Sequence, residues 1–271
     1  MNQDAIKKML LDIQGSELEF TVTLTGKRSK KVNGLYKPQT HEILLHSKNF
    51  QSDNQLVYTA VHEYAHHLQT ERREAESGGT LPPGNARAHT CDFWARFHGL
   101  LRAAEAKGYY RIGVDESPEL AALTETIRTK YLAQSGALLR ELGQMLSKAH
   151  ALCDAANIRF EDYVDRVLRM PRPAAEIIVK AAAYGVNPEI GYENMKLVAS
   201  IRSPDKRAEA ESQLLEGQTP DTVRAGLKKP PAEADPKTRL EQEKTRIEKT
   251  IGLLSRRLKL VEENLAALTG A

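Results

Sequence analysis

Strand-forming sequence is confined to one short region near the start of the chain, which limits the folds available to it. Residues 18–24 (LEFTVTL) predict one strand, and the following VNGLYKPQTHEILLH predicts a hairpin. Gly34 and Pro38 mark its turns, and residues 42–45 form its short apolar strand. Nearly everything after this region has helical periodicity. The sequence therefore predicts an α+β fold that is mostly helical.

Helices are predicted before and after the strand region. The first residues, MNQDAIKKMLLDIQ, lack the features of a signal peptide and predict an amphipathic helix of a cytoplasmic protein. Ser52 and Gln55 form a capping box that begins a helix with apolar residues at helical spacing up to Leu68. A polar loop is expected over residues 71–88, and Asn85 is expected to cap a helix that ends near Lys107. Further helices are predicted at 118–157, 160–168, 172–184, 192–201, 204–216 and 220–227.

The end of the chain has the most regular pattern. Residues 230–237 are expected to be a linker because of their prolines and charges. Apolar residues then follow an unbroken 4-3 spacing at Ile247, Ile251, Leu254, Leu258, Val261, Leu265 and Leu268, and Leu240 and Lys244 continue the phase backwards. This spacing predicts a coiled coil over 238–271 that pairs two protomers or binds a helical partner. Packing of this helix on its own domain is the alternative.

Composition excludes several classes of protein. The chain has 271 residues, 41% of them hydrophobic, and no apolar run of about 18 residues that could cross a membrane. It has 2 cysteines, too few for a disulfide scaffold or a four-cysteine zinc site. Any metal must therefore be bound by histidines and carboxylates. A net charge of +3 permits contact with nucleic acid without requiring it.

The segment VHEYAHH, residues 61–67, predicts a metal site. Two histidines four residues apart lie on the same face of a helix, so His62 and His66 can bind one ion. Glu63 then reaches a water activated by that ion and acts as the general base. Such sites hold Zn²⁺, here one per chain, and keep one position open for water. His67 points away from the metal face, so it is either a bystander or supports the ligands indirectly.

A third ligand has several candidates. The extended motif with Gly at position 69 and His at 72 is excluded, because those residues are Gln69 and Arg72. His89 shares an inward-facing helical stripe with Phe93 and Phe97, and we prefer it to His98, which lies off this stripe. Carboxylate alternatives are Asp92, Glu74 and Glu76.

These residues bring the chain close to a known family. The strand text GLYKPQTHEILLH, the motif VHEYAHH and the pattern HTCDFW at 89–94 together resemble the SprT-like (Spartan-type) zinc metallopeptidases, over roughly residues 1–105. The resemblance implies a small zincin-like domain over 1–110, with His62, His66 and His89 as ligands and Glu63 as the catalytic acid/base. In such folds a strand beside the site pairs with an extended peptide. We therefore expect Glu42, Ile43, Leu44 and Leu45 to form a substrate-binding edge, with an ordinary core strand as the alternative. Thr90 departs from the family's frequent glycine, and the family's cysteine ribbon is missing.

A second resemblance lies in the middle of the chain. Residues 155–229 are similar in pattern to the helix-turn-helix and helical tail of ParB/KorB-type DNA-binding proteins. This implies an all-helical, DNA-binding domain over 111–229. Phosphate contacts would then come from Arg159, Arg166, Arg169, Arg172 and Lys180. A solvated helical surface is the alternative.

Three functions follow from these predictions. The first is a cytoplasmic, nucleoid-associated zinc metallopeptidase that cleaves proteins bound or crosslinked to DNA. The second is a regulatory protease that cuts one repressor in a mobile-element or stress circuit. The third is a partition-type DNA-binding adaptor in which zinc is only structural, and a closed site with four protein ligands would favour it.

Overall fold

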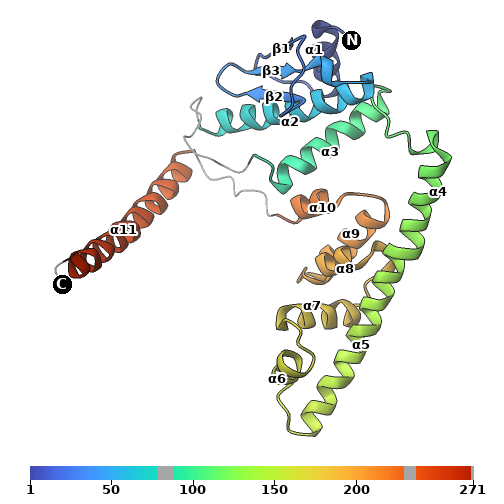
Figure 1. Ribbon diagram of the computed structural model, residues 1–271, viewed down its shortest axis with the longest axis vertical. Helices are drawn as coiled ribbons and strands as arrows, with labels where there is room; N and C mark the ends of the chain where they lie inside the picture. Colours follow the sequence, from blue (N-terminus) through green and yellow to red (C-terminus); the bar gives the residue numbers. More distant parts are fainter. Residues whose placement is uncertain (78–87, 229–235, 270–271) are drawn as a thin grey trace. The chain divides into compact units, whose positions relative to one another are not determined.

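The computed structural model describes residues 1–77, 88–228 and 236–269 (Figure 1). The chain divides into two compact units, one made of residues 1–71 and 85–228 and the other of residues 72–84 and 229–271. The amino-terminal elements of the first unit are α1 (Gln3–Ile13), β1 (Thr21–Leu24), β2 (Gly34–Lys37), β3 (Glu42–Leu45), η1 (Ser47–Asn49), α2 (Asp53–Ser77, whose last turn enters the second unit) and α3 (Cys91–Ala106).

A three-stranded sheet lies at the amino-terminal end of this unit, with strand order β1-β3-β2. The predicted hairpin is present: β2 pairs antiparallel with β3, and Gly34 lies opposite Leu45. β1 pairs parallel with the other side of β3, and Thr21 lies opposite Glu42. The central strand is therefore β3, and β2 is an edge strand.

One hydrophobic core joins α1, the sheet, α2 and α3. Its largest fully buried side chains include Tyr64 of α2, Phe93 and Phe97 of α3, and Ile43 of β3. The backbone N–H of Gln55 donates to Ser52 Oγ at the start of α2, as the capping box predicts. The predicted loop after residue 71 begins later, because α2 continues to Ser77. Asn85 lies outside the described residues, and Thr90 caps the described start of α3.

The rest of the first unit is helical and has a second core. Its elements are η2 (Val114–Glu116), α4 (Pro118–Thr126), the π-helical η3 (Ile127–Ala133), α5 (Gln134–Ala155), α6 (Phe160–Asp162), the π-helical η4 (Tyr163–Val167), α7 (Arg172–Ala183), η5 (Pro188–Ile190), α8 (Tyr192–Ala199), α9 (Pro204–Leu215) and α10 (Pro220–Leu227). These bounds agree with the predicted helices within about two residues at most ends. Leu139, Ile178 and Met195 are among the side chains that form this core. The two cores are separate clusters, and α10 lies against α3.

The described part of the second unit consists mainly of α11 (Pro236–Thr269), a continuous helix. The predicted linker 230–237 lies largely outside the described residues. The apolar side chains at Ile247, Ile251, Leu254, Leu258 and Val261 are 46% to 60% exposed. The heptad residues Leu240, Leu265 and Leu268 have side chains outside the described set. Within the described chain, no helix is long and apolar enough to cross a membrane.

Candidate metal centre

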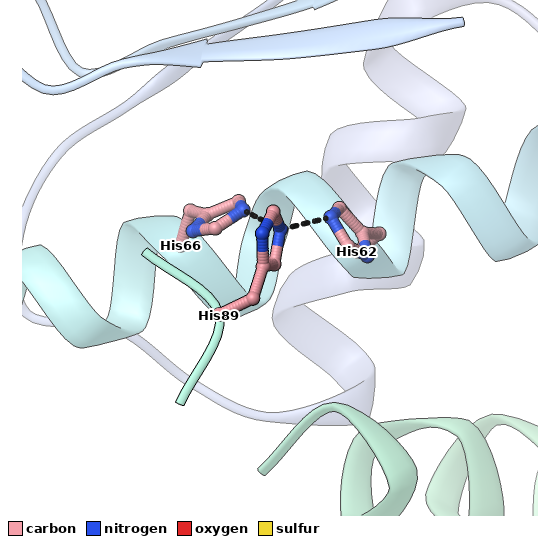
Figure 2. A group of neighbouring side chains, drawn as sticks. All are labelled: His62, His66 and His89. Carbon is pink, nitrogen blue, oxygen red and sulfur yellow. Dashed lines mark hydrogen bonds between the residues drawn. The ribbon is translucent and has the colours of Figure 1, made fainter. Parts of the chain in front are cut away.

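Three imidazole rings meet beside α2, and they are the ones that the sequence predicts. His62 and His66 project from one face of α2, and His89 reaches them from the residue that precedes the cap of α3 (Figure 2). The Nε2 atom of His89 lies 3.1 Å from that of His62 and 3.2 Å from that of His66. Within the described residues, this is the one group of three or more metal-ligating side chains whose ligand atoms lie within 4.8 Å of one another.

The spacing of these nitrogen atoms fits a tetrahedral zinc ion. A Zn–N bond of about 2.05 Å requires ligand nitrogens roughly 3.3 Å apart in a regular tetrahedron. The observed separations of 3.1 and 3.2 Å are close to that value. Three imidazoles can bind such an ion and leave its fourth position open, which is the arrangement of catalytic rather than structural zinc sites.

Aromatic side chains of α3 hold the imidazole rings in place. Phe93 stacks on His66 with ring centroids 4.3 Å apart, and Trp94 stacks on His89 at 5.5 Å. Phe97 meets His62 edge-on at 5.2 Å. This packing withdraws His62 from water, and burial together with the neighbouring His89 lowers the pKa of His62 to about 4. His62 is therefore neutral near pH 7, as a metal ligand must be.

Glu63 is buried under the edge strand. Its side chain is 7% exposed, and burial raises the pKa of its carboxyl to about 7, although a hydrogen bond from the backbone N–H of Tyr36 partly opposes the rise. Gly34 is required at this contact, because a Cβ atom there would lie 2.9 Å from Glu63 Cγ and 2.8 Å from Thr59 Cγ2. The sequence indicated Gly34 only as a turn residue. Its role in letting β2 approach α2 depends on the tertiary packing.

His67 is fully buried on another side of α2. Its Nε2 forms a 2.9 Å hydrogen bond with Ser16 Oγ, and its Nδ1 lies 3.3 Å from the Tyr36 hydroxyl. Burial lowers the pKa of His67 to about 4. His67 thus ties α2 to the strand that covers Glu63, a link that the sequence could not reveal because Tyr36 is 31 residues away.

The alternative third ligands have other contacts. His98 Nδ1 forms a 3.0 Å hydrogen bond with Thr219 Oγ1, at the start of α10. Asp92 forms an ion pair with Lys228 at 2.6 Å, and Glu76 pairs with Arg72 at 2.9 Å. Glu74 is likewise absent from the histidine group. The geometry therefore favours His89.

The expected substrate-binding edge at Glu42, Ile43, Leu44 and Leu45 is wrong as a sheet edge. These residues form β3, which pairs with β1 on one side and β2 on the other, so its backbone groups are already used. The ordinary core strand is the correct interpretation, since Ile43 and Leu45 are fully buried. Within the described sheet, β2 is the edge strand that lies over Glu63.

A polar cavity of about 370 Å³ lies beside this edge. It is lined by Asn33, Asn49, Phe50, Gln51, Asn54, Gln55, Tyr58, Thr59 and Tyr110. None of these side chains carries a formal charge at neutral pH. Asn33 precedes β2, and Thr59 lies one helical turn before Glu63, so two of the lining residues are close in sequence to the strand and helix that hold the candidate catalytic residue.

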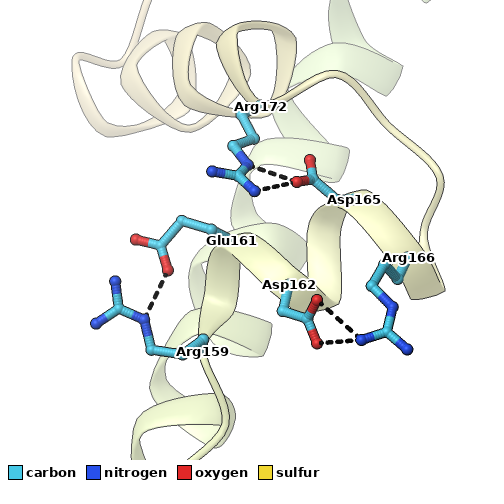
Figure 3. A network of polar contacts seen from close by, with 6 residues as sticks. All are labelled: Arg159, Glu161, Asp162, Asp165, Arg166 and Arg172. Carbon is cyan, nitrogen blue, oxygen red and sulfur yellow. Dashed lines mark hydrogen bonds and ion pairs between the residues drawn. The ribbon is translucent and has the colours of Figure 1, made fainter.

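The predicted DNA contacts lie just before α6, on η4 and α7, and in the turn between these two. Figure 3 shows that Arg159, Arg166 and Arg172 pair with Glu161, Asp162 and Asp165, the first two pairs at 3.2 and 3.3 Å. Lys180 pairs with Glu176 at 2.5 Å, and Arg169 occupies the turn before α7 with a left-handed φ of 54°. The two predicted helical segments are present, but carboxylates accompany four of the five cations.

No family model, curated protein or solved structure matches this chain. The interpretation of the site therefore rests on its own geometry.

Proposed function

We propose that this chain is a zinc-dependent metallopeptidase whose ligands are His62, His66 and His89. The observation that carries the proposal is the convergence of three imidazoles, with Nε2 of His89 at 3.1 and 3.2 Å from the other two, next in sequence to a buried carboxyl group. Zinc bound there would supply Lewis-acid chemistry, polarising a peptide carbonyl and lowering the pKa of a water molecule.

Glu63 has the properties of a general base and acid. A carboxyl group whose pKa is about 7 can accept the proton of the attacking water near neutral pH. The same group can then return that proton to the amine that leaves when the C–N bond breaks. Bound zinc would draw this pKa downward, because a nearby cation favours the carboxylate. The ring packing of Phe93 and Trp94 keeps the ligand histidines oriented while this happens.

The open edge of β2 is the observation that favours a peptide as the substrate. An extended peptide can pair with the side of β2 that β3 leaves open, which would carry it past Glu63. The uncharged cavity would then receive a neighbouring side chain of the substrate. We expect a preference for uncharged polar side chains there, since a charged one would lose water without gaining a counter-ion.

Association with DNA is a separate part of the proposal. It is supported by the basic side chains of Arg159, which precedes α6, and of η4 and α7, which are mostly in exposed ion pairs. Exposed pairs contribute only about 0–1 kcal/mol, so phosphates can displace the carboxylates. Loss of salt-dependent DNA binding in the full chain after Arg166→Ala, Arg169→Ala and Arg172→Ala together would support this location. Unchanged binding would contradict it.

Pairing of protomers through α11 is also proposed, because its heptad side chains are exposed along one face. Parallel pairing would bring Arg257 of one helix to Glu262 of the other, at the g and e positions that form such bridges.

Peptidase activity is tested with the zinc-loaded full chain. Denatured protein, a peptide library and the chain itself serve as substrates, with and without DNA. The parent should cleave, whereas Glu63→Gln should keep one zinc and lose cleavage, because the ligands remain and the base does not. Glu42→Gln is the matched control and should remain active. If the zinc-loaded parent cuts none of these substrates, the proposal fails and a structural zinc site becomes the better explanation.

A further inference from the structure

The long helical segment 118–155 carries a second apolar face that no other described element of the first unit covers. Eight large side chains form it, and we call them the outer stripe. They are Leu120, Leu123, Ile127, Tyr131, Leu138, Leu142, Met145 and Leu152, and they are 39% to 70% exposed. Their spacings of mostly three, four or seven residues place them along one side of α4, η3 and α5.

The side of α5 that adjoins the stripe is packed into the core of its own domain. Leu139, Leu146 and Cys153 are buried in the helical core. A Cβ atom added at Gly143 would lie 2.6 Å from the carbonyl oxygen of Ile178, so α5 is already in backbone contact with α7. Figure 1 likewise draws α6 to α9 on one side of the α4–α5 segment only. The outer stripe is therefore not a part of the domain core.

The size of the outer stripe is unusual for a surface that meets only water. Eight side chains of this size that expose about half of their area leave several hundred Å² of apolar surface in one continuous strip. One partner in a typical stable interface contributes about 800 Å². An apolar strip of this size marks an interaction surface, and its length suits a second long helix.

Charges beside the stripe identify the second helix. Glu141 and Lys148 lie two turns apart on one border, both exposed, and neither forms an ion pair within the described chain. The other border of the stripe is formed by Leu139 and Leu146, which are buried, so it offers no charge to a partner helix. In an antiparallel pair with its two-fold axis between residues 144 and 145, Glu141 of each copy faces Lys148 of the other. In a parallel pair this border would face the Leu139 and Leu146 border of the other copy, and neither charge would gain a partner.

We propose that the α5 part of the outer stripe, formed by Leu138, Leu142, Met145 and Leu152, is a two-fold interface between copies of this chain in which their α5 helices pair antiparallel. Leu142 and Met145 lie nearest the axis, with Leu138 and Leu152 on either side. This interface is independent of the peptidase activity and of α11. If both interfaces act, the chain can assemble beyond a dimer.

Sedimentation velocity of the full chain tests the proposal. Leu254→Lys with Leu258→Lys first removes the α11 seam, and this background variant should still have twice the chain mass of 30.2 kDa. Adding Leu142→Glu should reduce the mass to that of one chain, with an unchanged helical circular dichroism spectrum. The matched addition of Arg140→Glu, which lies on the same helix away from the stripe, should leave the dimer intact. A background variant that is monomeric at every concentration would overturn the proposal.

Charge exchange and crosslinking test the orientation, and neither depends on a disruptive core substitution. Glu141→Lys alone or Lys148→Glu alone should weaken dimerisation about tenfold, and the double variant should restore it. Met145→Cys should crosslink rapidly to its own copy because it lies near the axis, whereas Leu120→Cys should not. Rapid crosslinking of Leu120→Cys, with or without crosslinking at Met145→Cys, would refute the antiparallel arrangement.

Discussion

Replacing Glu63 by Gln should stabilise the metal-free protein, and the gain should depend on pH. Glu63 is 7% exposed, and burial raises the pKa of its carboxyl from 4.5 to about 7. A raised pKa means that the folded state disfavours the carboxylate relative to the unfolded state. Gln keeps the size of the side chain and cannot ionise, so it removes this penalty.

The magnitude follows from the shift in pKa. Each pKa unit corresponds to about 1.36 kcal/mol, so ionisation of Glu63 costs on the order of 3 kcal/mol of folding free energy. The penalty is absent below pH 4.5, where the group is protonated in both states. It grows as the pH rises and is complete above pH 7, when both states are ionised. The free energy of unfolding of Glu63→Gln minus that of the parent should therefore be about 3 kcal/mol larger at pH 8 than at pH 4.5.

Urea unfolding of chelator-treated protein between pH 4.5 and 8 provides the measurement. Other groups cancel in the comparison: the lowered pKa of His62 removes stability from both proteins as the pH falls below 6.5. Glu42→Gln is a control of opposite sign, because hydrogen bonds from Lys37 and Thr23 lower the pKa of Glu42. Added zinc should reduce the stability difference between Glu63→Gln and the parent, because a nearby cation favours the carboxylate. A stability difference that does not change across this pH range would refute the reasoning.

Two further predictions concern the ligands and the strand over Glu63. His89→Ala should weaken zinc binding more than about a hundredfold, because loss of a ligand costs more than loss of its supporting contacts. His98→Ala should leave zinc affinity unchanged, and competition with a chromogenic chelator measures both; equal losses would contradict the choice of His89. Gly34→Ala should destabilise the fold by about 1–3 kcal/mol, because its Cβ would press on Glu63. Gly15→Ala, with nothing within 4 Å of its Cβ, should not, and equal thermal shifts in the two variants would argue against close packing of β2 on α2.

Much of the metal centre could be predicted from the spacing of residues along the sequence. His62 and His66 share a helix face because they are four residues apart, and the structure confirms that they lie together with His89. The third ligand could be chosen over His98 because the phase of Phe93 and Phe97 marks the inward face of α3. Most helix bounds were predictable for the same reason, since caps and apolar periodicity act over a few residues.

The pairing of β1 with β3 could not be predicted from the sequence. The apolar residues 42–45 suit a central strand as well as an edge, and only the parallel pairing of β1 with β3 decides between them. That pairing joins residues 21 apart, such as Thr21 and Glu42, and β2 lies between them, so no tight turn connects the two strands and fixes their register. The predicted substrate-binding edge at residues 42–45 was wrong for this reason, and β2 is the edge strand beside Glu63.

The sequence by itself determined that two histidines and a glutamate share a helix, that the chain is mostly helical and that its last helix has a heptad seam. These properties depend on residues within one or two turns of each other. The tertiary structure alone decided that Glu63 is buried beneath Gly34 and Tyr36, and that Leu138, Leu142 and Met145 are left outside the core of α5. Burial depends on which distant elements pack together, and a side chain's pKa or exposure is fixed only when they do.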